Sequence, residues 1–217
     1  MTDLLDELRR DPRRFNESGR GVALLDEYSK WRDVQDLRLL LADDEVEVRR
    51  AAVFVASELG VAAAGVVEDV VPLLRQGDTR LAYDAMEVVA VCSTGTRAPL
   101  FAHVVSMLES DDETLSGLAM RLMARADDAQ LAAASNSGLL QADHCAGLAI
   151  ARGLQPPGEH RDARYAAVAA FRENSVEGGR AFAALSVSSE ASVRAFHDWM
   201  KGEKLYRMRS IEERSQP

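Results

Sequence analysis

Cysteine and aromatic residues are scarce in this chain of 217 residues. The two cysteines, Cys92 and Cys145, each lie in an apolar stretch with helical spacing, so we expect no disulfide framework and a reducing compartment, the cytoplasm. Phenylalanine, tryptophan and tyrosine together make up 6% of the residues. Strands favour aromatic and β-branched side chains, so this composition disfavours a β fold and favours closely packed helices.

Long apolar runs are also absent from the sequence. A membrane helix needs roughly 18 uninterrupted apolar residues, and because no segment reaches that length we predict no membrane span. The N-terminal segment, residues 1–15, mixes acidic and basic side chains and contains no apolar core, so it does not look like a secretory leader.

Basic residues are the minority among the charged side chains. The chain has 26 lysines and arginines against 35 aspartates and glutamates, a formal net charge of −9. Nucleic-acid binders need a basic surface that releases counterions from phosphates, so we predict no nucleic-acid partner. Residues 61–155 alone hold twelve acidic and six basic side chains, an excess that favours a basic protein partner.

Motifs of catalysis and metal binding are missing as well. The four histidines form no HExxH pattern, and the chain has no CxxC, GxSxG, phosphate-binding loop or dinucleotide fingerprint. Aspartate pairs at residues 43–44, 111–112 and 127–128 could suggest calcium, but they recur between helices, where capping explains them. Residues 18–21 could hold an anion at a helix start, or could simply form a capped loop. We therefore predict no enzyme activity, no cofactor and no metal.

The strongest positive signal is the stretch from residue 39 to residue 60, LLLADDEVEVRRAAVFVASELG. An apolar helix end is followed by Asp43 and Asp44, either of which suits the N-cap of a second helix that ends at Gly60. Residues 71–92 and 104–126 repeat this plan with a period of about 33 to 34 residues, which is typical of helical repeat proteins. Weaker copies are found at residues 144–154, 164–168 and 193–196.

Apolar spacing, caps and prolines predict the remaining elements. We expect helices at residues 4–10, 22–30, 33–42, 63–76, 97–109, 127–134, 162–172, 178–185 and 190–200. A loop is expected over residues 15–21, a hinge at the Pro-Pro-Gly punctuation of residues 155–158, and a tail over residues 201–217 whose last residues fray.

The pattern Asp-Asp-x-Val-x-Val-Arg-x-Ala-Ala, from Asp43 to Ala52, resembles the second helix of a HEAT-like repeat. This resemblance covers about residues 34–154 and implies an all-α fold, a right-handed α-solenoid of HEAT-like helix pairs. We predict a single domain over residues 1–217. Its parts are N-terminal capping helices (1–32), core repeats (33–155), and C-terminal repeats with the tail (156–217).

In such a solenoid the second helices line a concave face, which is the usual binding surface. Setting the repeats in register aligns a ladder of positions rich in arginine and aromatic residues, the types that dominate interfaces. The predicted partner-binding residues are Arg50, Phe54, Tyr83, Asp84, Glu87, Arg121 and Arg125. The alternative is that Arg80, Asp84 and Glu87 form ion pairs on a solvated face and that Phe54 belongs to the core.

The small size, the acidic charge, the FNESGRG segment and the LLDEY helix resemble bacterial immunity proteins built on HEAT-like repeats. The resemblance implies a non-catalytic protein that binds and neutralises a cognate toxin of a polymorphic toxin system. Two alternatives stay open. The first is a HEAT-like scaffold or adaptor, and the second is an enzyme of the HEAT-like DNA glycosylase or bilin lyase kind.

Overall fold

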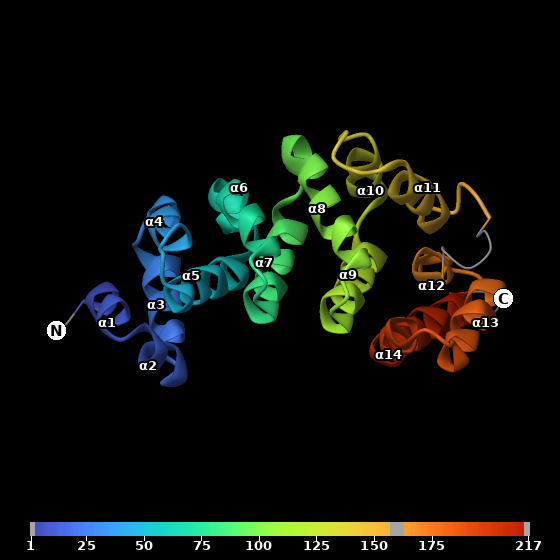
Figure 1. Ribbon diagram of the computed structural model, residues 1–217. Helices are drawn as coiled ribbons and strands as arrows, with labels where there is room; N and C mark the ends of the chain where they lie inside the picture. The colour runs from blue at the N-terminus through green and yellow to red at the C-terminus, as the bar shows by residue number, and fades with distance from the viewer. Residues whose placement is uncertain (1–2, 157–162, 215–217) are drawn as a thin grey trace. The chain divides into compact units, whose positions relative to one another are not determined.

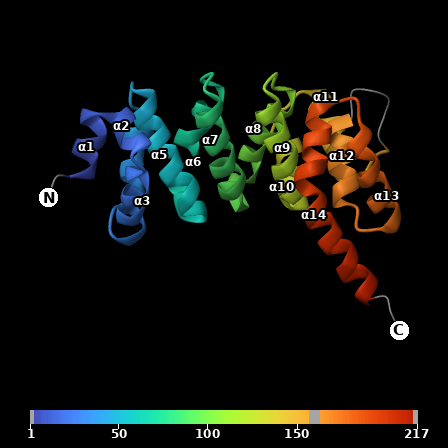
Figure 2. The same ribbon diagram turned by 90° about the horizontal axis from the view of Figure 1, so that it is seen from below.

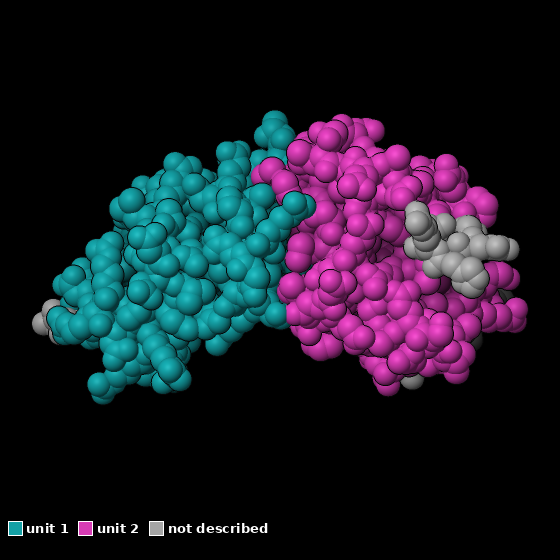
Figure 3. Space-filling view, in the orientation of Figure 1, with its two compact units in different colours: residues 1–97 teal, residues 98–217 magenta. Residues whose placement is uncertain are grey.

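The computed structural model of the protein describes residues 3–156 and 163–214, with side chains to residue 208. All regular elements in these ranges are α-helices or 3-10 helices, and no strand occurs there, which confirms the all-α prediction. The chain forms two compact units, Met1–Arg97 (unit 1) and Ala98–Pro217 (unit 2), coloured separately in Figure 3. The single domain expected from the sequence stays a prediction.

In unit 1, helix α5 packs against both α3 and α7, and α4 also packs on α5 (Figure 1). Ala52 of α5 and Ala85 of α7 are fully buried, and such small side chains let helices approach closely. The elements of unit 1 are α1 (Leu4–Arg10), α2 (Pro12–Glu17), α3 (Arg20–Lys30), η1 (Val34–Asp36), α4 (Leu37–Leu41), α5 (Val46–Leu59), η2 (Gly60–Val66), α6 (Val67–Val70), η3 (Val71–Arg75) and α7 (Thr79–Cys92).

The loop expected over residues 15–21 is wrong, because α2 extends to Glu17 and α3 begins at Arg20. Pro12 takes the first helical position, where its missing N–H is harmless, and the Asp11 carboxylate accepts a hydrogen bond of 3.2 Å from the Arg14 amide. Helix α3 then starts two residues earlier than predicted. Its buried side chains include Leu24, whereas Val22 is 63% exposed.

The turn before α5 differs from the expected N-cap. Neither Asp43 nor Asp44 caps α5, which begins after Glu45 without a side-chain cap. Instead the Asp43 carboxylate accepts a hydrogen bond of 2.9 Å from the Glu45 amide, and Arg49 donates to the carbonyls of Asp43 and Asp44 at 2.5 and 2.9 Å. Asp43 and Asp44 therefore stabilise the turn before α5, and no side chain caps the start of the helix.

The same turn recurs in unit 2 before helix α14. Arg194 donates to the carbonyls of Ser188 and Ser189 at 2.6 and 2.9 Å, as Arg49 does to its own turn. The Ser188 hydroxyl accepts a hydrogen bond of 3.2 Å from the Glu190 amide. The weak repeat at residues 193–196 therefore has the same turn structure as the strongest repeat, at residues 39–60.

Unit 2 is built around α9, which contacts both α12 and α14. Its elements are η4 (Gly95–Leu100), which begins in unit 1, α8 (Phe101–Ser106), η5 (Met107–Glu109), α9 (Glu113–Arg125), α10 (Asp128–Ser135), α11 (Ala142–Ala151), α12 (Ala163–Arg172), α13 (Val176–Ala184), η6 (Leu185–Val187) and α14 (Ala191–Arg214). The predicted hinge at 155–158 lies partly, and the frayed last residues wholly, outside the described residues.

The helix expected to end at Met200 is far longer, because α14 continues to Arg214. Figure 2 shows α14 running along α12 and α13 and extending beyond them. The ammonium of Lys204, which is 3% exposed, donates to the carbonyls of Ala170, Phe171 and Glu173 at the end of α12. A cation at the C-terminus of a helix satisfies free carbonyls, so this buried lysine fixes α14 on α12.

A buried polar pair joins α11 to α12. Nδ1 of His144 and the hydroxyl of Tyr165 form a hydrogen bond of 2.7 Å. The Tyr165 ring lies so close to the Gly147 backbone that a Cβ at position 147 would lie inside van der Waals distance. Gly147 is therefore required by the close approach of the ring.

Residues 46–75 are long and apolar enough by composition to cross a membrane, with a mean hydropathy of 1.7. The segment contains no run of 18 uninterrupted apolar residues, so the expectation of no membrane span stays a prediction. The stretch is not one straight helix, because α5 ends at Leu59 and Gly60 turns the chain with a φ of 57°. Val53 and Ala56 of α5 are fully buried within unit 1, as in the core helix of a globular unit.

Candidate partner-binding site

The structure places five of the predicted partner-binding residues in unit 1 and two in unit 2. Arg50 and Phe54 lie one turn apart on α5. Tyr83 and Glu87 lie one turn apart on α7, with Asp84 beside them. Arg121 and Arg125 lie one turn apart on α9 of unit 2.

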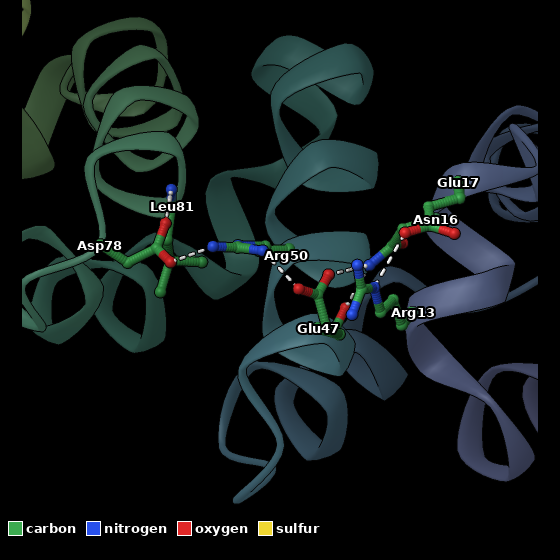
Figure 4. A network of polar contacts seen from close by, with 7 residues as sticks. All are labelled: Arg13, Asn16, Glu17, Glu47, Arg50, Asp78 and Leu81. Carbon is green, nitrogen blue, oxygen red and sulfur yellow. Dashed lines mark hydrogen bonds and ion pairs between the residues drawn. The ribbon is translucent and has the colours of Figure 1, made fainter.

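Arg50 is the centre of a polar network in unit 1 (Figure 4). One terminal nitrogen of its guanidinium donates to Glu47 on the same helix, and the other donates to Asp78, the N-cap of α7. Asp78 also accepts a hydrogen bond of 2.8 Å from the Leu81 amide. Asn16 of α2 donates to the Glu47 carboxylate at 2.8 Å, so the network connects three helices.

Charge stabilises this network. The hydrogen bond to Asp78 is the main cause that raises the pKa of Arg50, so the guanidinium stays charged. Burial alone would raise the pKa of Asp78, but the hydrogen bond from Arg50 and those from backbone amides outweigh it and hold that pKa below its usual value. Arg50 was predicted to contact a partner, and here both of its terminal nitrogens contact carboxylates of its own chain.

Phe54 faces α3 across the interface of the two helices. A Cβ added at Gly21 of α3 would lie 3.2 Å from the Phe54 ring, which shows how closely the ring packs on that backbone. The Phe54 side chain is half-buried. Phe54 thus contributes to packing between α3 and α5, as the alternative sequence interpretation proposed, while its role toward a partner stays a prediction.

Asp84 of α7 lies in a group of carboxylates. Glu87 on the same helix and Glu58 at the end of α5 both repel its charge, and Arg80 attracts it. Burial first, and then these two glutamates, raise the pKa of Asp84 to about 6. Among the described residues, the Asp84 carboxylate makes no hydrogen bond or ion pair, so the Arg80–Asp84 pair of the alternative sequence interpretation is not formed. We call Glu58, Asp84 and Glu87 the carboxylate cluster.

In unit 2 the predicted residues contact helix α14. The guanidinium of Arg121 lies over the Trp199 ring, 4.3 Å from its centroid, and Trp199 is itself 63% exposed. Arg125 pairs with Glu203 at 3.3 Å. The face of α9 that the register assigned to a partner is therefore occupied in part by α14 of the same unit.

Other candidate chemistry has structural explanations. Across the described ranges, no group of three or more histidine, cysteine, aspartate or glutamate residues is arranged to hold a metal ion. Cys92 and Cys145 are free, and burial raises the pKa of the Cys92 thiol, which contacts the Gly60 carbonyl at 3.4 Å. Arg20, considered for an anion at residues 18–21, pairs with Glu7 at 2.8 Å.

Several residues of these sites were not predicted from the sequence. Glu47 and Asp78 were not among the predicted site residues, and Asn16 was assigned to a loop, so their link through Arg50 was missed. The i, i+3 spacing of Glu47 and Arg50 on one helix was the sequence signal that could have predicted their ion pair. Glu58 and Trp199 have no sequence signal that marks them. In comparisons with known proteins, no family model and no curated protein matches the chain.

Proposed function

We propose that the protein is a non-catalytic α-helical repeat protein that binds a basic protein partner. In this proposal its helix pairs form a right-handed HEAT-like α-solenoid, and the partner is a bacterial toxin domain that the protein neutralises in the cytoplasm. The repeated turns at Arg49 and Arg194 support the repeat architecture. The proposed immunity function rests on the resemblance of the FNESGRG and LLDEY segments to bacterial immunity proteins.

The observation that carries the proposal is the carboxylate cluster next to Tyr83. Glu58 and Glu87 both repel the charge of Asp84, which destabilises the free protein, and a lysine or arginine of a partner would relieve that repulsion. Tyr83, half-buried on the same helix, is a residue type that anchors interfaces. A scaffold or adaptor would use the same surface, whereas a DNA glycosylase is disfavoured by the net charge of −9.

The proposal is tested by purifying the protein with its partner from the native host and identifying the partner by mass spectrometry. With that partner, we expect Tyr83→Ala to cost about 1 to 3 kcal/mol of binding free energy. Glu87→Lys should slow association, and the association rate should fall steeply with salt. Glu68→Lys, a charge reversal at an exposed residue of α6, is the control. If both test variants bind as the parent does, the assignment of this face is wrong.

Replacing Asp84 with asparagine should stabilise the free protein at pH 7. Because the folded-state pKa is raised to about 6, the folded protein keeps a proton that the unfolded chain loses, so stability falls as the pH rises from about 4 to 6. Asp84→Asn removes this cost. Solvent screens the half-buried group, so we expect a gain of about 1 kcal/mol at pH 7, roughly 3 °C in Tm, and none near pH 4.

The same variant should bind the basic partner less tightly, because the charge that attracts the partner is gone. Parent binding should weaken between pH 7 and pH 5 as Asp84 gains its proton, and the variant should lose part of that dependence. Thermal unfolding and titration calorimetry at both pH values measure these effects. A variant that is less stable than the parent at pH 7 would show that Asp84 is favourably paired.

A further inference from the structure

A second surface of unit 1 is a groove of about 540 Å³ between α3 and α5, which we call the α3–α5 groove. Its apolar lining comes from Val22 and Leu25 of α3, Val34 of η1, and Leu59 and Ala62 at the end of α5 and in η2. Val22 is 63% exposed. Apolar side chains gathered in an open groove are typical of binding surfaces, whereas single exposed apolar residues are not.

Tyr28 also lines the groove, and its hydroxyl is unusual. The residue is 3% exposed, and its hydroxyl makes no hydrogen bond with any described residue. Burial raises the pKa of Tyr28 to about 12, so the hydroxyl stays protonated and can both donate and accept. A buried hydroxyl without a partner destabilises the free protein. A polar group of a ligand reaches this hydroxyl only if the atoms that cover it shift on binding, and that contact would then be favoured.

The charge next to the groove is negative. Two carboxylates line it, Asp26 and Glu58. Asp26 is neutralised by Lys30 at 2.7 Å, but Glu58 makes no ion pair with a described residue and acts on Asp84 of the carboxylate cluster. Residues 1–97 hold 19 aspartates and glutamates against 13 lysines and arginines, which leaves −6. A cationic segment therefore complements Glu58 at the groove and the net negative charge of the unit.

We propose that the α3–α5 groove binds an amphipathic helix of the basic partner, with apolar side chains in the groove and a lysine or arginine beside Glu58. This inference rests on the proposed function and names the part of the partner that is held. A helix is the fitting form because the described part of unit 1 has no strand whose edge a partner strand could extend. Glu58 lines the groove and also belongs to the carboxylate cluster, so the apolar surface and the cluster are neighbours.

The test uses a fluorescein-labelled synthetic peptide of about 14 residues, with leucines at helical spacing and lysines at the other positions. Two control peptides keep the length: one has glutamate in place of each lysine, and one has serine in place of each leucine. We expect the leucine–lysine peptide to bind the full chain in fluorescence polarisation, and both control peptides to bind at least tenfold more weakly. Equal binding of either control peptide would overturn the proposal.

Substitutions in the protein show where the peptide binds. Val22→Asp adds negative charge, so a purely electrostatic attraction would strengthen, but an apolar contact in the groove would be lost. We expect about tenfold weaker peptide binding for Val22→Asp. Leu39→Asp adds the same charge at a residue that is 72% exposed outside the groove, and it should not weaken binding. Peptide binding unchanged by Val22→Asp would overturn the proposal.

Two further variants test the polar contacts. Glu58→Gln should weaken binding about threefold, while Glu68→Gln, at an exposed residue of α6, should not. Tyr28→Phe should raise the Tm of the free chain, because it removes a buried hydroxyl without a partner, and should weaken peptide binding. A lower Tm would show that the hydroxyl is already satisfied, which contradicts the proposal. Circular dichroism confirms that each variant folds.

Failure of this inference can be separated from failure of the proposed function. If the groove variants do not affect a co-purified basic partner but Asp84→Asn does, the groove assignment fails and the proposed function stands. If the peptide binds in the groove as expected but the partner recovered from the host is acidic, the proposed function fails.

Discussion

Replacement of Phe171 by alanine is expected to lower the free energy of unfolding by about 4 kcal/mol, the largest effect we predict for a single substitution. Phe171 is fully buried in unit 2. Its ring packs edge to face against Phe182 and Phe196, with centroid distances of 5.6 and 6.0 Å, and the Arg207 guanidinium lies 4.8 Å from its centroid. The substitution leaves a cavity and removes these aromatic contacts.

Denaturant unfolding followed by circular dichroism measures this loss. If the two compact units unfold in separate transitions, the transition of residues 98–217 should carry the shift. Val176→Ala, at a side chain that is 52% exposed on α13, is the matched control and should change little. A loss for Phe171→Ala no larger than that of the control would contradict the packing described for α12, α13 and α14.

Arg50→Ala is expected to cost about 2 to 3 kcal/mol of stability, because it leaves two carboxylates without their cation. Glu47 and Asp78 are 23% and 18% exposed at their side chains, so water replaces the lost interactions only in part. Arg13→Ala is the matched control. The Arg13–Glu17 pair lies next to the same network in Figure 4, but Arg13 is 82% exposed, so no measurable loss is expected.

The pH dependence separates this network from ordinary packing. Because the folded-state pKa of Asp78 is lowered, its contribution is fully present above about pH 4, the unfolded value, and is lost as the pH falls below it. The difference between parent and Arg50→Ala should therefore shrink at acidic pH. A difference that is constant from pH 7 to pH 3 would show that Arg50 acts through its apolar contacts alone.

The sequence predicted the long second helices well, because the spacing of their apolar residues and the residues at their ends indicate similar bounds. Helix α5 starts and ends within one residue of the predicted bounds, and Gly60 ends it with a positive φ. Between these helices the prediction was weaker. The segments at residues 34–41, 60–75 and 95–109 alternate between α and 3-10 turns, a choice that depends on tertiary packing more than on propensity.

The candidate site was harder to predict than the helices. Residue type and repeat register selected Arg50, Arg121 and Arg125 as partner contacts, but register says nothing about which carboxylates and rings of the chain lie nearby. Each of the three contacts its own unit, through Asp78, Trp199 and Glu203. Such pairs join residues 28 to 78 positions apart in the sequence, a separation over which local patterns carry no information.

The close approach of Tyr165 to Gly147 has a consequence for how this protein can diverge in evolution. A chain that keeps this packing of α11 on α12 cannot gain a side chain at position 147 unless position 165 becomes smaller. The hydrogen bond to His144 would then be lost, so the histidine would be free to vary as well. In diverged descendants that keep this packing, positions 144, 147 and 165 should therefore change together, and their covariation would mark the lineage.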